Sequence, residues 1–84
     1  MMRIRERFLD YIKGKYYNSG DALPLERWNI FIGSFGNDVI VAQKYLQELI
    51  KHGYFEEKVR NNNVICLVIT RFGIDSIYND DLPF

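Results

Sequence analysis

The side chains that most often carry catalysis or bind metals are scarce in this sequence. His52 is its one histidine and Cys66 its one cysteine. A metal site needs several Cys, His or carboxylate ligands that converge, and a nucleophile needs an adjacent base. Neither arrangement can be assembled, and Asp80-Asp81 is better explained as a solvated helix end than as an acid/base pair. We therefore predict no catalytic residue, no metal site and no cofactor, and a protein that is not an enzyme.

The two single residues have structural explanations. His52 follows Lys51 at the end of an expected helix, where cations face the negative end of the dipole. Cys66 lies in an apolar run and is interpreted as a small buried hydrophobic residue, with a redox-sensing thiol as the alternative. One cysteine cannot form an intrachain disulfide, which favours a reducing compartment, so we expect a cytoplasmic location. The longest apolar runs, 39–42 and 64–69, are far shorter than a membrane span of about 20 residues.

The first half of the chain has the apolar spacing of two helices. Residues 2–17 show the period of an amphipathic helix, and the turn-forming cluster 18–21 ends it. A short extended piece at 22–23 is expected next. Pro24 is accepted in the first turn of a second helix, because its missing N–H is not needed there. The apolar residues of this second helix are Leu25, Trp28 and Ile32.

The clearest element is a third helix, which we expect to begin at Asn37 and to end at Gly53. The Asn37 side chain can cap free backbone N–H groups, and glycine commonly follows a helix C-terminus. At about 100° per residue, the apolar side chains fall within an arc of about 140°. They are Val39, Ala42, Tyr45, Leu46, Leu49 and Ile50. The opposite face carries Ile40, Lys44, Gln47 and Lys51, with Gln43 at its boundary.

The last third of the chain has a β pattern followed by a short helix. Residues 54–60 and 64–70 are β-prone, and the three asparagines 61–63 between them suit a hairpin tip, since asparagine tolerates positive φ. Thr70 can cap a final helix. Its apolar positions are Phe72, Ile74, Ile77 and Tyr78. The expected fold is therefore α+β, with a three-helix core, a two-stranded hairpin and a short C-terminal helix.

Length and charge limit the possible functions. A chain of 84 residues can bury only one small core, so we expect a single domain over 1–84. The composition, 48% hydrophobic and 26% charged, is that of a globular protein. Eleven basic and eleven acidic residues give zero net charge, which argues against a polycationic tail or a strong membrane-surface binder.

The order of elements resembles the winged helix-turn-helix superfamily over nearly the whole chain. Residues 41–56, VAQKYLQELIKHGYFE, are similar to that family's recognition helix, the glycine after it and the start of the wing. Residues 69–77, ITRFGIDSI, look like the "Leu-Thr-x-x-Gly" start of the final helix in many bacterial and archaeal members.

The resemblance implies that the third helix enters the DNA major groove while the wing approaches the backbone or minor groove. On the helix, glutamine can bond adenine, lysine can reach guanine or phosphate, and isoleucine can touch a thymine methyl. Asn37 at the helix start could donate to a phosphate. The implied DNA contacts are Asn37, Ile40, Gln43, Lys44, Gln47 and Lys51 on the helix and Lys58, Arg60 and Asn62 in the wing.

Charge leaves two interpretations of this surface open. Residues 37–63 carry four acidic and four basic side chains, so non-specific DNA affinity should be modest and salt-sensitive. Glutamine and lysine are also ordinary surface-helix residues on helices that bind nothing. Arg3 and Arg7 lie four residues apart on a basic first helix and could contact phosphate. The alternative is a solvated face with pairs within the helix, such as Arg3 or Arg5 with Glu6.

We therefore expect sequence-specific binding of double-stranded DNA, in a transcriptional regulator of a prokaryote or of one of its viruses or plasmids. A domain this small offers few base contacts, which favours a homodimer on two half-sites. Apolar residues that exceed one small core would form the dimer interface through the first helix and the C-terminal segment: Tyr11, Tyr17, Ile77, Tyr78, Leu82 and Phe84. The alternative is a winged-helix protein-interaction (adaptor) module without DNA binding.

Overall fold

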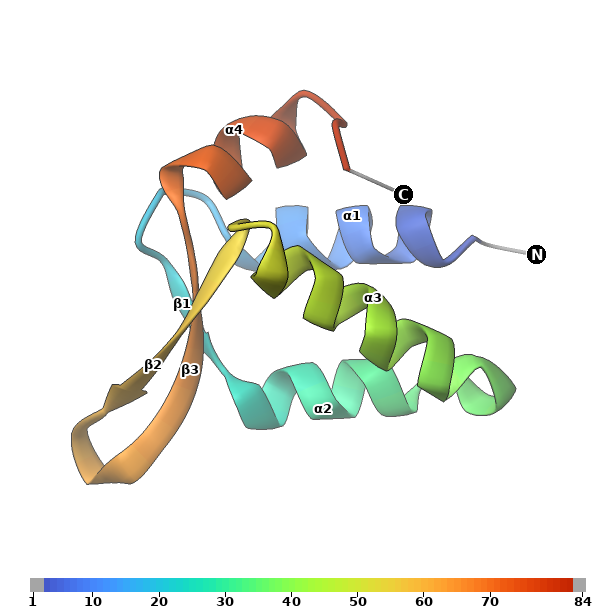
Figure 1. Cartoon of the computed structure of the whole chain (residues 1–84), viewed down its shortest axis with the longest axis horizontal. Coiled ribbons are helices and arrows are strands. Elements are labelled where there is room, and N and C mark those ends of the chain that lie inside the picture. Colours follow the sequence, from blue (N-terminus) through green and yellow to red (C-terminus); the bar gives the residue numbers. More distant parts are fainter. Residues whose placement is uncertain (1–2, 83–84) are drawn as a thin grey trace.

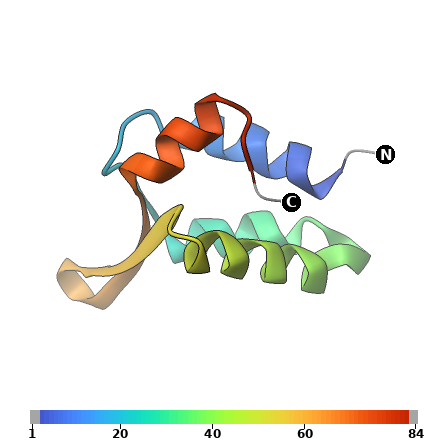
Figure 2. The same ribbon diagram turned by 45° about the horizontal axis from the view of Figure 1, so that its top comes forward.

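The computed structural model describes residues 3–82 and shows four α-helices and a three-stranded antiparallel sheet within them (Figure 1). The helices are α1 (Ile4–Lys15), α2 (Leu25–Gly33), α3 (Val39–Lys51) and α4 (Arg71–Tyr78). The strands are β1 (Ala22–Pro24), β2 (Phe55–Arg60) and β3 (Val64–Ile69). The expected α+β class is confirmed. In both views α4 lies against α1 and α3 lies against α2, while the β2–β3 hairpin projects from one end (Figures 1 and 2).

The sheet has one strand more than the two-stranded hairpin expected from the sequence. The short piece Ala22–Pro24 pairs with β3, so the strand order is β1-β3-β2. Pro24 ends this strand and precedes α2, which begins at Leu25 rather than at the proline. A proline is accepted at this position because β1 is a strand at the edge of the sheet.

An aromatic cluster forms the centre of the core. Phe8, Tyr16, Trp28 and Phe55 are almost completely buried, and they come from α1, the residue that ends it, α2 and β2. The Trp28 indole N–H donates to the Tyr16 hydroxyl at 2.9 Å, and that hydroxyl donates to the Leu67 carbonyl at 2.9 Å. Burial raises the pKa of Tyr16, so the hydroxyl keeps its proton. This chain of hydrogen bonds fixes α1 and α2 against the sheet.

The turn after α1 is closed by one carboxylate. Asp21 accepts backbone N–H groups of Tyr17 at 2.8 Å and Asn18 at 2.9 Å. These hydrogen bonds hold the pKa of Asp21 below its usual value, because they favour the charged form. The turn brings β1 beside β3, with a backbone bond from Gly20 to Ile69 at 2.9 Å.

The start of α3 differs from the prediction that Asn37 caps it. Gly36 takes a φ of 58°, and a 3-10 turn over Gly36–Asp38 leads directly into the helix. The Asp38 amide donates to the Phe35 carbonyl, and the Val39 amide donates to the Gly36 carbonyl. The preceding turn therefore supplies hydrogen bonds that a capping side chain would otherwise make. Asp38 occupies the N-cap position and its side chain makes no capping bond.

The start of α4 matches the prediction. The Thr70 hydroxyl accepts the Gly73 amide at 2.9 Å and donates to the Gly53 carbonyl at 2.6 Å. Gly53 has a φ of 85°, the left-handed conformation expected at the end of α3. Ile74 and Ile77 are buried, whereas Phe72 and Tyr78, which the pattern also assigned to the apolar face, are 55% and 49% exposed.

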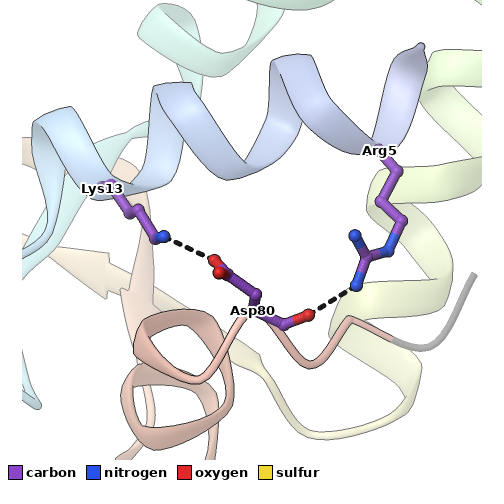
Figure 3. Close-up of polar contacts among 3 residues, drawn as sticks. All are labelled: Arg5, Lys13 and Asp80. Carbon is purple, nitrogen blue, oxygen red and sulfur yellow. Dashed lines mark hydrogen bonds and ion pairs between the residues drawn. The ribbon is translucent and has the colours of Figure 1, made fainter.

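The segment after α4 is attached to α1 by two cations (Figure 3). Lys13 Nζ lies 2.5 Å from a carboxylate oxygen of Asp80, and the Arg5 guanidinium donates to the Asp80 carbonyl at 2.5 Å. Leu82 follows and is buried in the core. We call this set of three residues, Arg5, Lys13 and Asp80, the C-terminal clamp.

The expected surplus of apolar residues for a dimer interface is partly wrong. Ile77, on the buried face of α4, and Leu82, after the clamp, both lie in the core of the single chain. Tyr17 remains 64% exposed, and Tyr78, which is 49% exposed, donates to the Tyr16 carbonyl at 3.1 Å. Tyr11 is half-buried and packs on the core. Phe84 lies outside the described residues.

Candidate nucleic-acid interface

The outward face of α3 is a continuous polar stripe. Its apolar side is anchored by Ala42, Leu46 and Leu49, all buried. The other side carries five exposed side chains at helical spacing. We call them the α3 face: Ile40, Gln43, Lys44, Gln47 and Lys51. Ile40 is 58% exposed. The position of these residues on one exposed face agrees with the periodicity of the sequence.

The α3 face contains cations but no acid. Neither Lys44 nor Lys51 forms an ion pair with a carboxylate of residues 3–82. Glu48 lies one position to the side and contacts His52, whose Nε2 is 3.2 Å from a Glu48 carboxylate oxygen. The acid of α3 is thus engaged with the histidine at the helix end, and the two lysines remain available to a ligand.

Val41 extends the apolar part of this surface and was not identified from the sequence. It is 53% exposed and, with Lys44, Tyr45 and Glu48, lines a shallow hollow of about 200 Å³ on the side of α3. The helical phase of Val41 differs from that of Ala42, and the apolar spacing of the sequence assigned it to neither face of the helix.

A second hollow, of about 320 Å³, lies between α2, α3 and β2. Gln43 and Gln47 of the α3 face line it together with Glu57 of β2. Glu57 is therefore the acidic residue among those that line this hollow. It would disfavour a phosphate there, while an exposed base amino group could donate to it.

The predicted wing residues, on the β2–β3 hairpin, do not all project from the same face of the sheet. In the β2–β3 register, Lys58 is opposite Cys66 and Arg60 is opposite Val64, so these side chains share one face of the sheet. Glu57 is opposite Leu67 and belongs to the other face, which also carries the buried Phe55. The predicted wing cations therefore project from the face opposite to the one that packs on the core.

One of the two basic side chains of the β2–β3 hairpin is paired with an acid of the same hairpin. Lys58 Nζ lies 3.7 Å from a Glu56 carboxylate oxygen on the same strand, whereas Arg60 forms no ion pair within residues 3–82. Asn62 is exposed at the tip and takes a φ of 66°. Arg60 and Asn62 are thus the hairpin positions whose side chains remain available to a ligand, and the charge of Lys58 is partly neutralised.

Three of the basic residues of α1 have partners within the chain. Arg5 and Lys13 belong to the C-terminal clamp (Figure 3). Arg7 donates to the Ser34 hydroxyl at 2.6 Å and lies over the Phe35 ring at 3.9 Å, so it faces the end of α2 rather than the α3 face. Arg3 is exposed at the start of α1. The structure thus separates Arg7 from the α3 face.

The remaining sequence-based expectations concern a metal site, the cysteine and a membrane span. Within residues 3–82 no three His, Cys, Asp or Glu side chains lie together as a metal site would require. Cys66 is buried in β3, as the interpretation as a hydrophobic residue predicts. None of the helices in this range has the length and apolar character needed to cross a bilayer.

Comparison with known proteins gives no match to the chain among family models, curated proteins or solved structures. Function is therefore inferred from the chain's own residues.

Proposed function

We propose that this chain is a winged helix-turn-helix domain that binds double-stranded DNA sequence-specifically and regulates transcription by occupying an operator. In this proposal α3 enters the major groove, and the β2–β3 hairpin is the wing, which approaches the backbone or minor groove. The order of elements supports it, since a helix pair is followed by an exposed helix and then by a projecting hairpin (Figure 1).

The observation that carries the proposal is the chemistry of the α3 face. Two glutamines and two lysines without carboxylate partners in the described chain lie along one exposed side of a helix that is anchored by buried leucines on the other. Glutamine can bond adenine with two hydrogen bonds, and lysine can reach guanine or phosphate. Lys44 and Gln47 lie at the middle of the face and are the residues assigned to base contact.

The charge distribution predicts weak non-specific binding. Lys44, Lys51 and Arg60 have no ion-pair partner within residues 3–82, whereas Lys58 is paired with Glu56. Each phosphate neutralised on B-DNA contributes a slope of about −0.9 in log K against log salt. We therefore expect a shallow slope of roughly −3 from these three cations.

The test is selection from a random duplex pool, followed by binding of the selected site at low and moderate salt. Lys44→Glu and Arg60→Glu are expected to weaken binding at least tenfold, because each places a carboxylate against DNA phosphate. Gln47→Ala is expected to relax the preference at one base pair, at a cost of about 1–3 kcal/mol. Arg71→Glu, on the exposed start of α4, is the matched control and should bind normally.

Failure to enrich any sequence, with no duplex binding even at low salt, would contradict the proposal. One observation would then favour the adaptor function. Val59 and Ile65 are opposite each other in the hairpin register and are 68% and 41% exposed, and Ile40 and Val41 are exposed on α3. Exposed apolar side chains of this kind suit a protein partner.

A homodimer on two half-sites is part of the proposal, with α1 and the C-terminal segment as the contacting surface. Tyr17 and Tyr78 remain as its exposed aromatic residues. Light scattering coupled to gel filtration, with and without the selected site, measures the stoichiometry. A monomer at tens of micromolar that also binds DNA as a monomer would contradict it.

A further inference from the structure

A groove between α1 and α2 lies apart from the α3 face and the wing. It has a volume of about 350 Å³ and is lined by Tyr11, Lys15, Arg27, Ile30, Phe31 and Ser34. We call it the α1–α2 groove. None of its lining residues belongs to α3, β2 or β3. It arises because α1 and α2 run alongside each other, as Figure 1 shows.

The floor of the groove is aromatic. The rings of Tyr11 and Phe31 are stacked, with centroids 4.0 Å apart and planes 10° from parallel. Ile30 stands at the edge and is 66% exposed. A rigid pair of rings with an exposed aliphatic side chain beside it offers an apolar surface to a flat, uncharged molecular body.

The rim of the groove is cationic. Lys15 follows Tyr11 by four residues on α1, and Arg27 precedes Phe31 by four residues on α2, so each cation lies one helical turn from an aromatic residue. Lys15 Nζ is 5.9 Å from the centre of the Tyr11 ring. Neither cation forms an ion pair with a carboxylate of the described residues, and the groove has no acidic lining residue among them.

The other polar groups of the groove are already satisfied. The Ser34 hydroxyl donates to the Phe31 carbonyl at 2.6 Å and accepts from Arg7 at 2.6 Å. The Tyr11 hydroxyl donates to the Arg27 carbonyl at 3.3 Å. The donors left for a ligand are therefore the Lys15 ammonium and the Arg27 guanidinium.

We propose that the α1–α2 groove binds a small aromatic carboxylate. The ring of the ligand covers Phe31 and Ile30, and its carboxylate accepts hydrogen bonds from Arg27 and Lys15. An inorganic phosphate would leave the apolar floor unused, and a neutral aromatic compound would leave both cations without a counter-charge. Arginine suits the carboxylate because its planar donors match the two oxygens. The volume is in the range of small-molecule sites.

The test uses 3-phenylpropionate as the probe and its neutral analogue 3-phenylpropan-1-ol as the comparison. Trp28 is a built-in reporter, because its ring lies 5.1 Å from Tyr11 and 5.9 Å from Phe31. We expect saturable fluorescence and amide-resonance changes with a Kd of a few millimolar, as about 0.3 kcal/mol for each heavy atom of the probe implies. The alcohol should bind about tenfold more weakly.

Three variants locate the site. Arg27→Gln should weaken probe binding about tenfold, since it removes a charged donor while keeping a side chain of similar length. Ile30→Asp places a carboxylate at the rim and should abolish binding. Arg71→Gln removes an equal charge from α4, outside the groove, and should bind the probe normally. Circular dichroism and thermal unfolding confirm that each variant is folded.

Two results would overturn the proposal. Equal affinity for the acid and the alcohol would show that the cations take no part in binding. Binding of inorganic phosphate as tight as that of the probe would show a general anion surface, of the kind that contacts a nucleic-acid backbone. The test is independent of DNA binding, because its readouts are Trp28 fluorescence and amide resonances of the protein alone.

Discussion

Gly73 is the position where the absence of a side chain is most important. A Cβ atom there would collide with the Tyr54 carbonyl oxygen and would lie 3.1 Å from a side-chain carbon of Ile69. The same Tyr54 carbonyl accepts the Thr70 amide at 3.1 Å, so it cannot move without breaking that bond. The Thr-x-x-Gly sequence thus has a structural cause, since threonine caps α4 and glycine lets the helix approach the end of α3.

Gly73→Ala is therefore expected to reduce the free energy of unfolding by about 3 kcal/mol, the upper part of the range for overpacking. Gly14→Ala is the matched control, because Gly14 lies in α1 and a methyl group added there would have no neighbour within 4 Å. It should stabilise the protein by up to about 1 kcal/mol through helix propensity. Urea denaturation of both variants measures the difference, and equal stabilities would contradict the close approach at Gly73.

Some residue-level features could be predicted from the sequence and others could not. Thr70 as a cap and Gly53 as a left-handed residue follow from local preferences. Asn37 does not cap α3, because the preceding turn bonds the amides of Asp38 and Val39. The partners of Arg7 are set by tertiary structure. Arg7 contacts Ser34 and Phe35 through the packing of α1 on α2, and that contact cannot be inferred from its four-residue spacing to Arg3.

At the scale of elements, the hairpin tip contains two consecutive residues in the left-handed region. Asn62 has a φ of 66° and Asn63 a φ of 61°, while Asn61 precedes them without a positive φ. Left-handed backbone costs most L-residues about 1–2 kcal/mol, and less for asparagine. The run of three asparagines therefore encodes this turn, as the sequence pattern suggested.

Asn63→Gly should stabilise the hairpin by up to about 1 kcal/mol, because glycine has no steric penalty at positive φ. Asn61→Gly is the matched control and should destabilise it slightly, since it adds chain entropy where no positive φ is needed. Thermal unfolding of the two variants makes the comparison. The turn geometry would be wrong if Asn61→Gly were the more stable protein.

Helices and strands could be predicted where a long segment has regularly spaced apolar residues. Strand pairing between segments far apart in the chain could not be predicted. The cores of all four helices and both hairpin strands coincide with the predicted segments. The pairing of Ala22–Pro24 with β3 joins residues that are far apart in the chain, such as Ala22 and Val68, and no local pattern encodes it. For the candidate interface, periodicity places the α3 face, whereas the side of the sheet from which Lys58 and Arg60 project depends on the strand register.

At the scale of the whole molecule, the net charge is zero, but some cations have acidic partners and others do not. In the C-terminal clamp, two cations of α1 contact a single residue, Asp80. The α3 face and the α1–α2 groove contain cations that have no carboxylate partner in the described chain. In both proposals, the cations without carboxylate partners are the ones that contact the ligand. Both proposed binding surfaces therefore depend on local charge, and the total is a poor guide to either.

The C-terminal clamp predicts a specific acid sensitivity. The hydrogen bond and positive charge of Lys13 hold the pKa of Asp80 below its usual value of 3.8. The unfolded chain therefore takes up this proton at a higher pH than the folded protein, so the clamp's contribution is complete above the unfolded pKa and is lost as pH falls through the folded pKa. Because the carboxylate is exposed, added salt should weaken the effect.

Asp80→Asn isolates that charge. Asp80 has a φ of 53°, which asparagine also tolerates, and the backbone carbonyl that accepts from Arg5 is unchanged. We expect the variant to be less stable than the parent at neutral pH and to lose less stability between about pH 5 and pH 2, measured by urea denaturation across that range. Asp10→Asn, an exposed position on α1, should keep the parent's pH dependence. The backbone bonds to Asp21 persist in both variants, so some acid sensitivity remains in each. An Asp80→Asn protein with the parent's full pH dependence would mean that the Lys13–Asp80 ion pair does not stabilise the folded tail.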